Sequence, residues 1–214
     1  FKGHGRGEKP MLEGSVNHWL NDANEALMIG KRIGKKVIII GLSTGGTVGT
    51  WLAAQGDPSI QSLILISPNF GLRYKGATVL GWPWGASLAK GFMGPYREWT
   101  PINEKQSKYW TWKYSVKALL PMMGMVNLIQ NLGFEAISTP IMIIYSQKDT
   151  TVNSQLTEKY FKRLGSSSKK LWHYKNSVDK EQHILAGDIV SPGSSEELLP
   201  EILKFVNSIK AVDI

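Results

Sequence analysis

The chain has 214 residues, enough for one domain with a substantial hydrophobic core. It contains no cysteine, which excludes disulfides, cysteine-ligated metals and thiol catalysis. The net charge of +8 would suit a nucleic-acid or anionic-membrane partner, but the basic residues are scattered and no nucleic-acid-binding motif accompanies them.

The first elements alternate between loop, helix and strand patterns. Residues 1–12 are rich in glycine and charge, so we expect a loop there. Apolar residues recur at helical spacing over 16–33 and Gly34 is a suitable stop, which predicts an amphipathic helix. The run 35–40 ends in Val-Ile-Ile-Ile. A short run of β-branched residues that is apolar on both faces indicates a buried parallel strand.

The alternation then continues to residue 69. Small and apolar residues over 45–55 predict a second helix, which Gly56-Asp57-Pro58 ends. Residues 60–67 predict the next buried strand, which Pro68-Asn69 stops.

The segment 70–133 has a different composition. It holds five of the eight tryptophans, several methionines, and glycine and proline at many points, but no β-branched run. We interpret it as an irregular, mainly helical insertion. The tryptophans are Trp82, Trp84, Trp99, Trp110 and Trp112.

Strand and helix patterns resume after the insertion. We predict strands over 140–146 and 170–174, and a helix over 154–164 between them. A closing amphipathic helix covers 198–209 and is preceded by Ser194 and Ser195, which suit a helix start. Strands that alternate with helices indicate an α/β fold with a parallel sheet.

The two basic clusters and the apolar runs set the expected partners. Lys31 to Lys36 and Lys169 to Lys170 lie directly before apolar runs, so we interpret them as solvated helix ends and turns, with a binding patch as the alternative. We expect no nucleic-acid partner. No apolar run approaches the roughly 18 to 20 residues of a transmembrane helix, so we expect no transmembrane segment.

The sequence Gly41-Leu42-Ser43-Thr44-Gly45 lies between a predicted strand and a predicted helix. A nucleophile elbow needs this strand-to-helix turn, and glycines on both sides leave room for it. The first amide of the helix, at Thr44, would bind an oxyanion with help from the helix dipole. The alternative is an ordinary Gly-Ser turn without chemistry. We predict Ser43 as the nucleophile.

A serine nucleophile needs a histidine base, which in this kind of fold follows it in the chain. His4 and His18 precede Ser43. His173 lies within a predicted strand, whereas His183 lies in the polar loop beyond that strand's carboxyl end. We therefore predict His183 as the base.

The histidine in turn needs a carboxylate that orients it. Asp149 directly follows the predicted strand 140–146, so it should lie on the same edge of the sheet as Ser43. Asp179 is the main alternative because it shares a loop with His183, and a plain turn or helix-cap role for Asp149 is another. We predict Asp149 as the acid.

With these residues in order, the chain resembles the α/β-hydrolase superfamily, most of all its carboxylesterase, monoacylglycerol lipase and lysophospholipase-like branch. The segments that carry the resemblance are Gly3-His4-Gly5, the Trp19 and Asp22 pair, 41–46, 64–68, 146–152 and 182–185. It implies the α/β-hydrolase fold, a mostly parallel sheet flanked by helices. It also implies that 1–69 and 134–214 form the core and that 70–133 forms a helical cap over the active site.

The resemblance also leaves a gap at the start of the chain. In such enzymes the Gly-His-Gly turn follows the fourth strand, and an earlier His-Gly loop supplies the second oxyanion amide. No such residues precede Gly3 here. We therefore expect the chain to be a carboxyl-terminal portion that lacks the N-terminal strands and one oxyanion donor.

Together these features predict a serine hydrolase that cleaves carboxylic esters through an acyl-enzyme. The alternatives are thioester, amide or carbon–carbon hydrolysis by the same triad, or a binding module without catalysis. We expect a small-molecule acyl ester as substrate and no cofactor. We also expect no metal, because the four histidines are dispersed.

Overall fold

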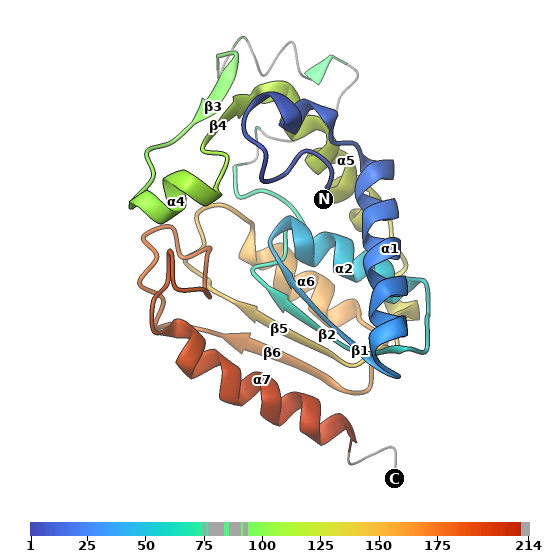
Figure 1. The fold of residues 1–214 in the computed structure, drawn as a ribbon. Coiled ribbons are helices and arrows are strands. Elements are labelled where there is room, and N and C mark those ends of the chain that lie inside the picture. The colour runs from blue at the N-terminus through green and yellow to red at the C-terminus, as the bar shows by residue number, and fades with distance from the viewer. Residues whose placement is uncertain (75, 77–83, 86–90, 92–93, 211–214) are drawn as a thin grey trace.

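The computed structural model describes residues 1–74, 76, 84–85, 91 and 94–210 (Figure 1). Part of the predicted insertion, including Trp82, lies outside the described residues. The fold is built on a parallel sheet of four strands in the order β1-β2-β5-β6. The strands are β1 (Val37–Leu42), β2 (Ile60–Ile66), β5 (Ile141–Tyr145) and β6 (Lys169–His173). This parallel sheet agrees with the α/β fold predicted from the sequence.

Parallel pairing aligns the carboxyl ends of these strands along one edge of the sheet. Leu42 pairs with Ile66, and Ile66 pairs with Ile144. All five residues of β5 are buried, as expected for a central strand that is covered on both faces. Segments that follow β1, β2 and β5 therefore leave the sheet side by side.

Helices cover the two faces of the sheet (Figure 1). The face of Leu63, Ile141 and Ile143 packs against residues that include Ala53 of α2 (Thr44–Ala54) and Tyr160 of α6 (Ser154–Arg163). The opposite face packs against α7, and the members of that cluster include Ile64, Met142, Ile144, Leu198, Phe205 and Val206. Helix α7 spans Ser194–Lys210. The sheet is thus the middle layer of three, the arrangement expected for buried β-branched strands.

Helix α1 (Val16–Ile33) begins and ends where the sequence predicts. The Ser15 side chain accepts a hydrogen bond from the His18 amide at 3.1 Å and so caps its first turn. Its buried face, with Trp19, packs against α2 and against Met125 of α5 (Leu119–Gln130). The periodic apolar spacing therefore corresponds to a buried stripe.

Strand β1 forms one edge of the sheet. Ile38 and Ile40, two residues apart and hence on the same face, are 40% and 62% exposed. The predicted strand 35–40 differs from β1 in that the observed strand continues through Gly41 to Leu42. The strand therefore leads directly into Ser43.

The segment 70–133 contains more than helices. The structure has an antiparallel pair, β3 (Tyr96–Glu98) and β4 (Lys113–Ser115), together with α4 (Glu104–Tyr109) and a 3-10 turn, η3 (Val116–Ala118). The mainly helical prediction missed this strand pair because strands of three residues are too short to show a repeat. The division of the chain into cap and core stays a prediction.

The 3-10 turn η1 (Lys9–Glu13) lies within and just beyond the predicted loop. The 3-10 turn η4 (Phe134–Ala136) lies between predicted elements. Pro10 at the start of η1 suits a first helical turn, where the missing amide costs no hydrogen bond. Within the described residues, none of the helices has the combination of length and apolar character that crossing a membrane requires.

Candidate active site

Ser43 lies in the sharp turn between β1 and α2, in a strained backbone conformation. Its φ and ψ angles are 51° and −118°, which a residue with a side chain rarely adopts. A Cβ on Gly41 would lie 2.5 Å from the Gly45 carbonyl oxygen, and a Cβ on Gly46 would lie 3.0 Å from the Cβ of Pro68. A side chain at Gly41 would therefore clash with the backbone of the turn, whereas one at Gly46 would fit only tightly against Pro68.

Backbone hydrogen bonds hold this turn in place. The Ser43 amide donates to the Ile66 carbonyl at 2.9 Å. The Ser43 carbonyl accepts from the amides of Gly46 at 2.9 Å, Thr47 at 3.2 Å and Asn69 at 3.0 Å. The strained residue is thus tied both to its own helix and to the end of the neighbouring strand, β2.

His183 reaches Ser43 from the loop that follows β6. Its Nε2 atom lies 3.0 Å from Ser43 Oγ, and its Nδ1 atom lies 2.8 Å from Asp149 Oδ2. The network assigns the tautomer: Nδ1–H donates to the carboxylate, and Nε2 accepts from the serine hydroxyl. His183 is 7% exposed and Asp149 is 1% exposed, so the contact between them is shielded from water. The structure brings the three predicted residues together in the order serine, histidine, carboxylate.

The carboxylate of Asp149 is fixed by its own turn. Oδ1 accepts the amides of Thr151 and Val152, each at 2.8 Å, while Oδ2 faces His183. Asp149 follows β5 by way of Ser146, whose carbonyl accepts the Asp149 amide at 3.2 Å. One oxygen is therefore held by the backbone and the other is left for the imidazole.

The carboxylate of Asp179, the alternative acid, is hydrogen-bonded to the backbone at His183. Its Oδ2 atom accepts the backbone amide of His183 at 2.9 Å, not a ring nitrogen.

Thr44 is the first residue of α2, where helical amides have no acceptor within the helix. Its amide also lies at the positive end of the helix dipole, next to Ser43.

The other histidines occupy other surroundings. His173 ends β6 and its ring centroid lies 5.6 Å from that of Tyr145, and burial lowers the pKa of His173. His4 packs edge-on against Trp19 at 5.3 Å. His18 Nδ1 lies 3.1 Å from the Glu13 carbonyl oxygen.

Sequence reasoning missed the residues that join the Asp149 turn to the His183 loop. The Glu181 carbonyl accepts from the Thr150 amide at 3.0 Å, and the Ser146 hydroxyl donates to Gln182 Oε1 at 3.2 Å. Partners more than 30 positions apart in the chain leave no local pattern that would reveal them. The two loops are therefore held to each other as well as to the sheet.

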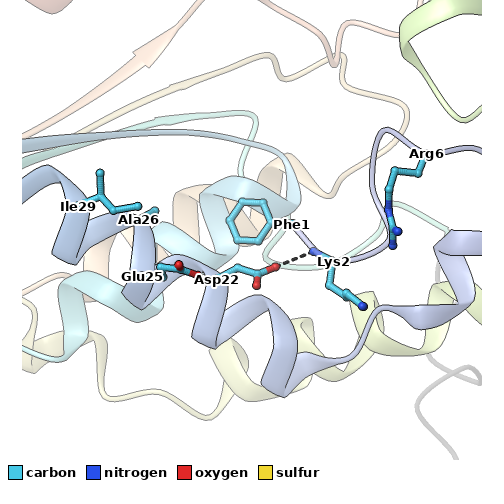
Figure 2. Close-up of a pocket in the computed structure, with 7 residues that line it drawn as sticks. All are labelled: Phe1, Lys2, Arg6, Asp22, Glu25, Ala26 and Ile29. Atoms are coloured by element: carbon cyan, nitrogen blue, oxygen red, sulfur yellow. Dashed lines mark hydrogen bonds between the residues drawn. The ribbon is translucent and has the colours of Figure 1, made fainter.

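A separate open pocket lies along α1 near the start of the chain (Figure 2). Its volume is about 460 Å³, and the Lys2 backbone nitrogen donates to Asp22 Oδ2 at 2.6 Å on its wall. None of the residues that line it belongs to the Ser43, His183 and Asp149 set.

Across the part of the chain that the structure describes, no group of three or more histidine, aspartate or glutamate residues is arranged to hold a metal ion.

A family model described as serine aminopeptidase, S33, matches residues 1–178. No curated protein sequence matches the chain. One similar solved structure comes from work on LipS and LipT, two metagenome-derived lipolytic enzymes; its TM-score is 0.79 at 18% identity, with 97% of this chain and 79% of that chain covered.

Two further structures are similar over nearly the whole chain. The monoacylglycerol lipase of Paleococcus ferrophilus has a TM-score of 0.69 at 16% identity and covers 98% of this chain and 81% of its own. A soluble variant of the monoglyceride lipase of Saccharomyces cerevisiae, in complex with a substrate analogue, has a TM-score of 0.68 at 16% identity, with 97% and 75% covered. At these identities the likeness establishes the fold alone, and it confirms the α/β-hydrolase fold class predicted from the sequence.

Proposed function

The chain belongs to the family described as serine aminopeptidase, S33, a family of α/β hydrolases, and from this premise we propose that it cleaves carboxylic esters with Ser43 as the nucleophile. The observation that carries the proposal is the continuous contact from Asp149 Oδ2 through the two ring nitrogens of His183 to Ser43 Oγ, at 2.8 and 3.0 Å. A serine hydroxyl is a weak nucleophile, and this arrangement is the one that activates it.

The acylation step follows from these contacts. Ser43 Oγ attacks the ester carbonyl carbon while its proton passes to His183 Nε2. The imidazolium that forms is stabilised by Asp149, and the negative oxygen of the tetrahedral intermediate is bound by the Thr44 amide. When the intermediate collapses, the carbon–oxygen bond to the leaving alcohol breaks. His183 returns the proton to the alcohol oxygen, which leaves the acyl group on Ser43.

Deacylation repeats the sequence with water as the nucleophile. His183 Nε2 takes a proton from water as the water oxygen attacks the acyl carbonyl. The bond to Ser43 Oγ then breaks, the proton returns to that oxygen and the carboxylic acid leaves. The buried Asp149 keeps the same ring orientation in both halves of the reaction because its other oxygen is held by two amides.

For the natural substrate we propose an ester of a fatty or other apolar acyl chain. The similar solved structures are named as lipolytic enzymes and as lipases of monoacylglycerols. Apolar side chains that include Leu120 and Met122, on α5, pack around the buried cluster of Val116, Leu119 and Met123. These side chains belong to the segment 70–133, which is predicted to cover the active site, and there flexible thioether and aliphatic groups would suit an acyl chain.

Amide hydrolysis is the second candidate, because the family description names aminopeptidases. Turnover of p-nitrophenyl acyl esters and of aminoacyl p-nitroanilides, measured on the same preparation, separates the two. We expect the ester to be cleaved faster. Faster cleavage of the anilide would replace the proposal with the amide reaction.

The test of the proposal uses two serine variants. Ser43→Ala removes the nucleophile and should abolish ester turnover. Ser208→Ala is the matched control, because Ser208 is exposed on α7 and its hydroxyl bonds only to the Phe205 carbonyl of its own helix among the described residues. Turnover that survives in Ser43→Ala, or that is lost equally in Ser208→Ala, would refute the assignment.

A further inference from the structure

The loop that carries His183, residues 175–185 and hereafter the His183 loop, has no regular helix or strand. The carboxylate of Asp179 organises it. Oδ2 accepts the amides of His183 at 2.9 Å and Ile184 at 2.8 Å, and Oδ1 accepts the amide of Glu181 at 3.1 Å. One side chain thus binds three backbone amides, two of which flank the Cα atom of the histidine. Hydrogen bonds to an ionised carboxylate are the stronger kind.

The residue before His183 adds to this constraint. Gln182 has a φ angle of 55°, in the left-handed region that a residue with a side chain seldom occupies. Its side-chain amide donates to the carbonyls of Ser177 at 2.9 Å and Asp179 at 3.0 Å, and its own backbone amide donates to the Asp179 carbonyl at 3.0 Å. The unusual backbone angle is therefore held by hydrogen bonds to the carbonyls of Ser177 and of Asp179 itself.

The position of the His183 Cα atom has little freedom to change. Its ring must meet Ser43 Oγ, which sits on the turn after β1, and Asp149 Oδ2, which sits on the turn after β5. These partners belong to different elements, so a shift of the loop cannot be followed by both. A displacement of about 1 Å in a catalytic group costs on the order of 10²-fold in rate.

We propose that Asp179 is a positioning residue for His183, which it holds through the peptide backbone while Asp149 holds the imidazole ring. The proposal rests on the function proposed for Ser43, His183 and Asp149. It gives the two carboxylates near His183 different tasks. Asp149 has to accept a ring proton, whereas Asp179 has only to accept amides, and a neutral side-chain oxygen can do that.

Asparagine and alanine substitutions separate these tasks. In Asp179→Asn, the side-chain oxygen can keep the bonds from the backbone amides of His183 and Ile184. The new side-chain NH2 group then faces the Glu181 backbone amide, and this bond is lost because both groups are donors. We expect kcat within about 3-fold of the wild type. Asp179→Ala loses all three bonds, and we expect kcat to fall about 10- to 100-fold with KM within about 2-fold. Asp149→Asn should lower kcat by about 10⁴-fold, because the wrong tautomer is then favoured.

A second readout needs no substrate. The Nδ1–H proton of His183, bound to Asp149, should give a downfield proton NMR resonance that disappears in Asp149→Ala. We expect the resonance to remain in the wild type and in Asp179→Asn, and to broaden or vanish in Asp179→Ala. If the wild type cleaves no ester but the resonances follow this pattern, the proposed function fails and the positioning role stands.

Three results would overturn the positioning role. The first is wild-type kcat together with an unchanged resonance in Asp179→Ala. The second is a loss of kcat in Asp179→Asn as large as in Asp149→Asn, which would make Asp179 the orienting acid. The third is a parallel fall of kcat and melting temperature in both Asp179 variants with the resonance intact, which would make Asp179 a structural residue only.

Discussion

Replacing Gly41 with alanine should disturb the Ser43 turn more than the same change at the two glycines that follow. The added Cβ would lie 2.5 Å from the Gly45 carbonyl oxygen and 2.8 Å from the Gly46 Cα, and both are backbone atoms that cannot move alone. Overpacking of this kind costs about 1 to 3 kcal/mol of unfolding free energy. In a chain of this size, each kcal/mol lowers the melting temperature by about 2 to 4 °C.

The neighbouring glycines provide the controls. At Gly46 the nearest atom is Pro68 Cβ at 3.0 Å, so we expect a smaller loss, about 1 kcal/mol. At Gly45 nothing lies within 4 Å, and alanine in a helix should raise stability by about 0.5 to 1 kcal/mol.

Denaturant unfolding of the three variants gives the free energies, and the rate of labelling by a fluorophosphonate probe reports the geometry of Ser43. Gly41→Ala should show the largest loss of both. Equal stability of the Gly41 and Gly45 variants would contradict the account of the turn.

Two other changes test the structure around this turn and at the far end of the sheet. Thr47→Val should lower the free energy of unfolding in urea by about 1 to 3 kcal/mol, because the Thr47 hydroxyl donates to the buried Asn69 carbonyl at 2.7 Å. Thr47→Ser keeps the hydroxyl and should lose much less stability. Equal losses in both variants would show that this bond contributes little. The hydrogen bond from Lys31, with a contribution from Ser59, holds the pKa of Asp57 at about 2, below its usual 3.8. The ionised carboxylate therefore stabilises the folded state above about pH 3.8, and this stabilisation is lost as the pH falls through 2. Asp57→Asn should therefore lower the melting temperature at pH 6 but not at pH 1.5, and a loss that is the same at both pH values would contradict this sign.

The long elements of the core were predictable because each carries its own periodic pattern. Helix α1 has the predicted bounds Val16–Ile33, and β2 and β5 fall within the predicted strands. The antiparallel pair of β3 and β4 was not predictable, since its strands of three residues show no repeat and depend on pairs such as Arg97 with Tyr114.

The candidate site was predictable as a set of residue types in chain order, but not as a geometry. Sequence order alone admits Asp149 or Asp179 as the partner of His183, because both lie on loops beyond the carboxyl ends of strands. What separates them is which hydrogen-bond donor each carboxylate faces, a ring nitrogen for Asp149 and a backbone amide for Asp179. That difference arises from tertiary contacts between loops, such as the one from Ser146 to Gln182, and no local pattern encodes it.

The most direct test of the central claim is the site of covalent modification by an organophosphate ester such as diethyl p-nitrophenyl phosphate. Only an activated serine displaces the nitrophenol and retains the phosphoryl group. Mass spectrometry of the digested protein should locate one diethylphosphoryl group per chain, on Ser43, and none in Ser43→Ala. An unmodified wild-type chain, or modification at another residue that persists in Ser43→Ala, would contradict the claim.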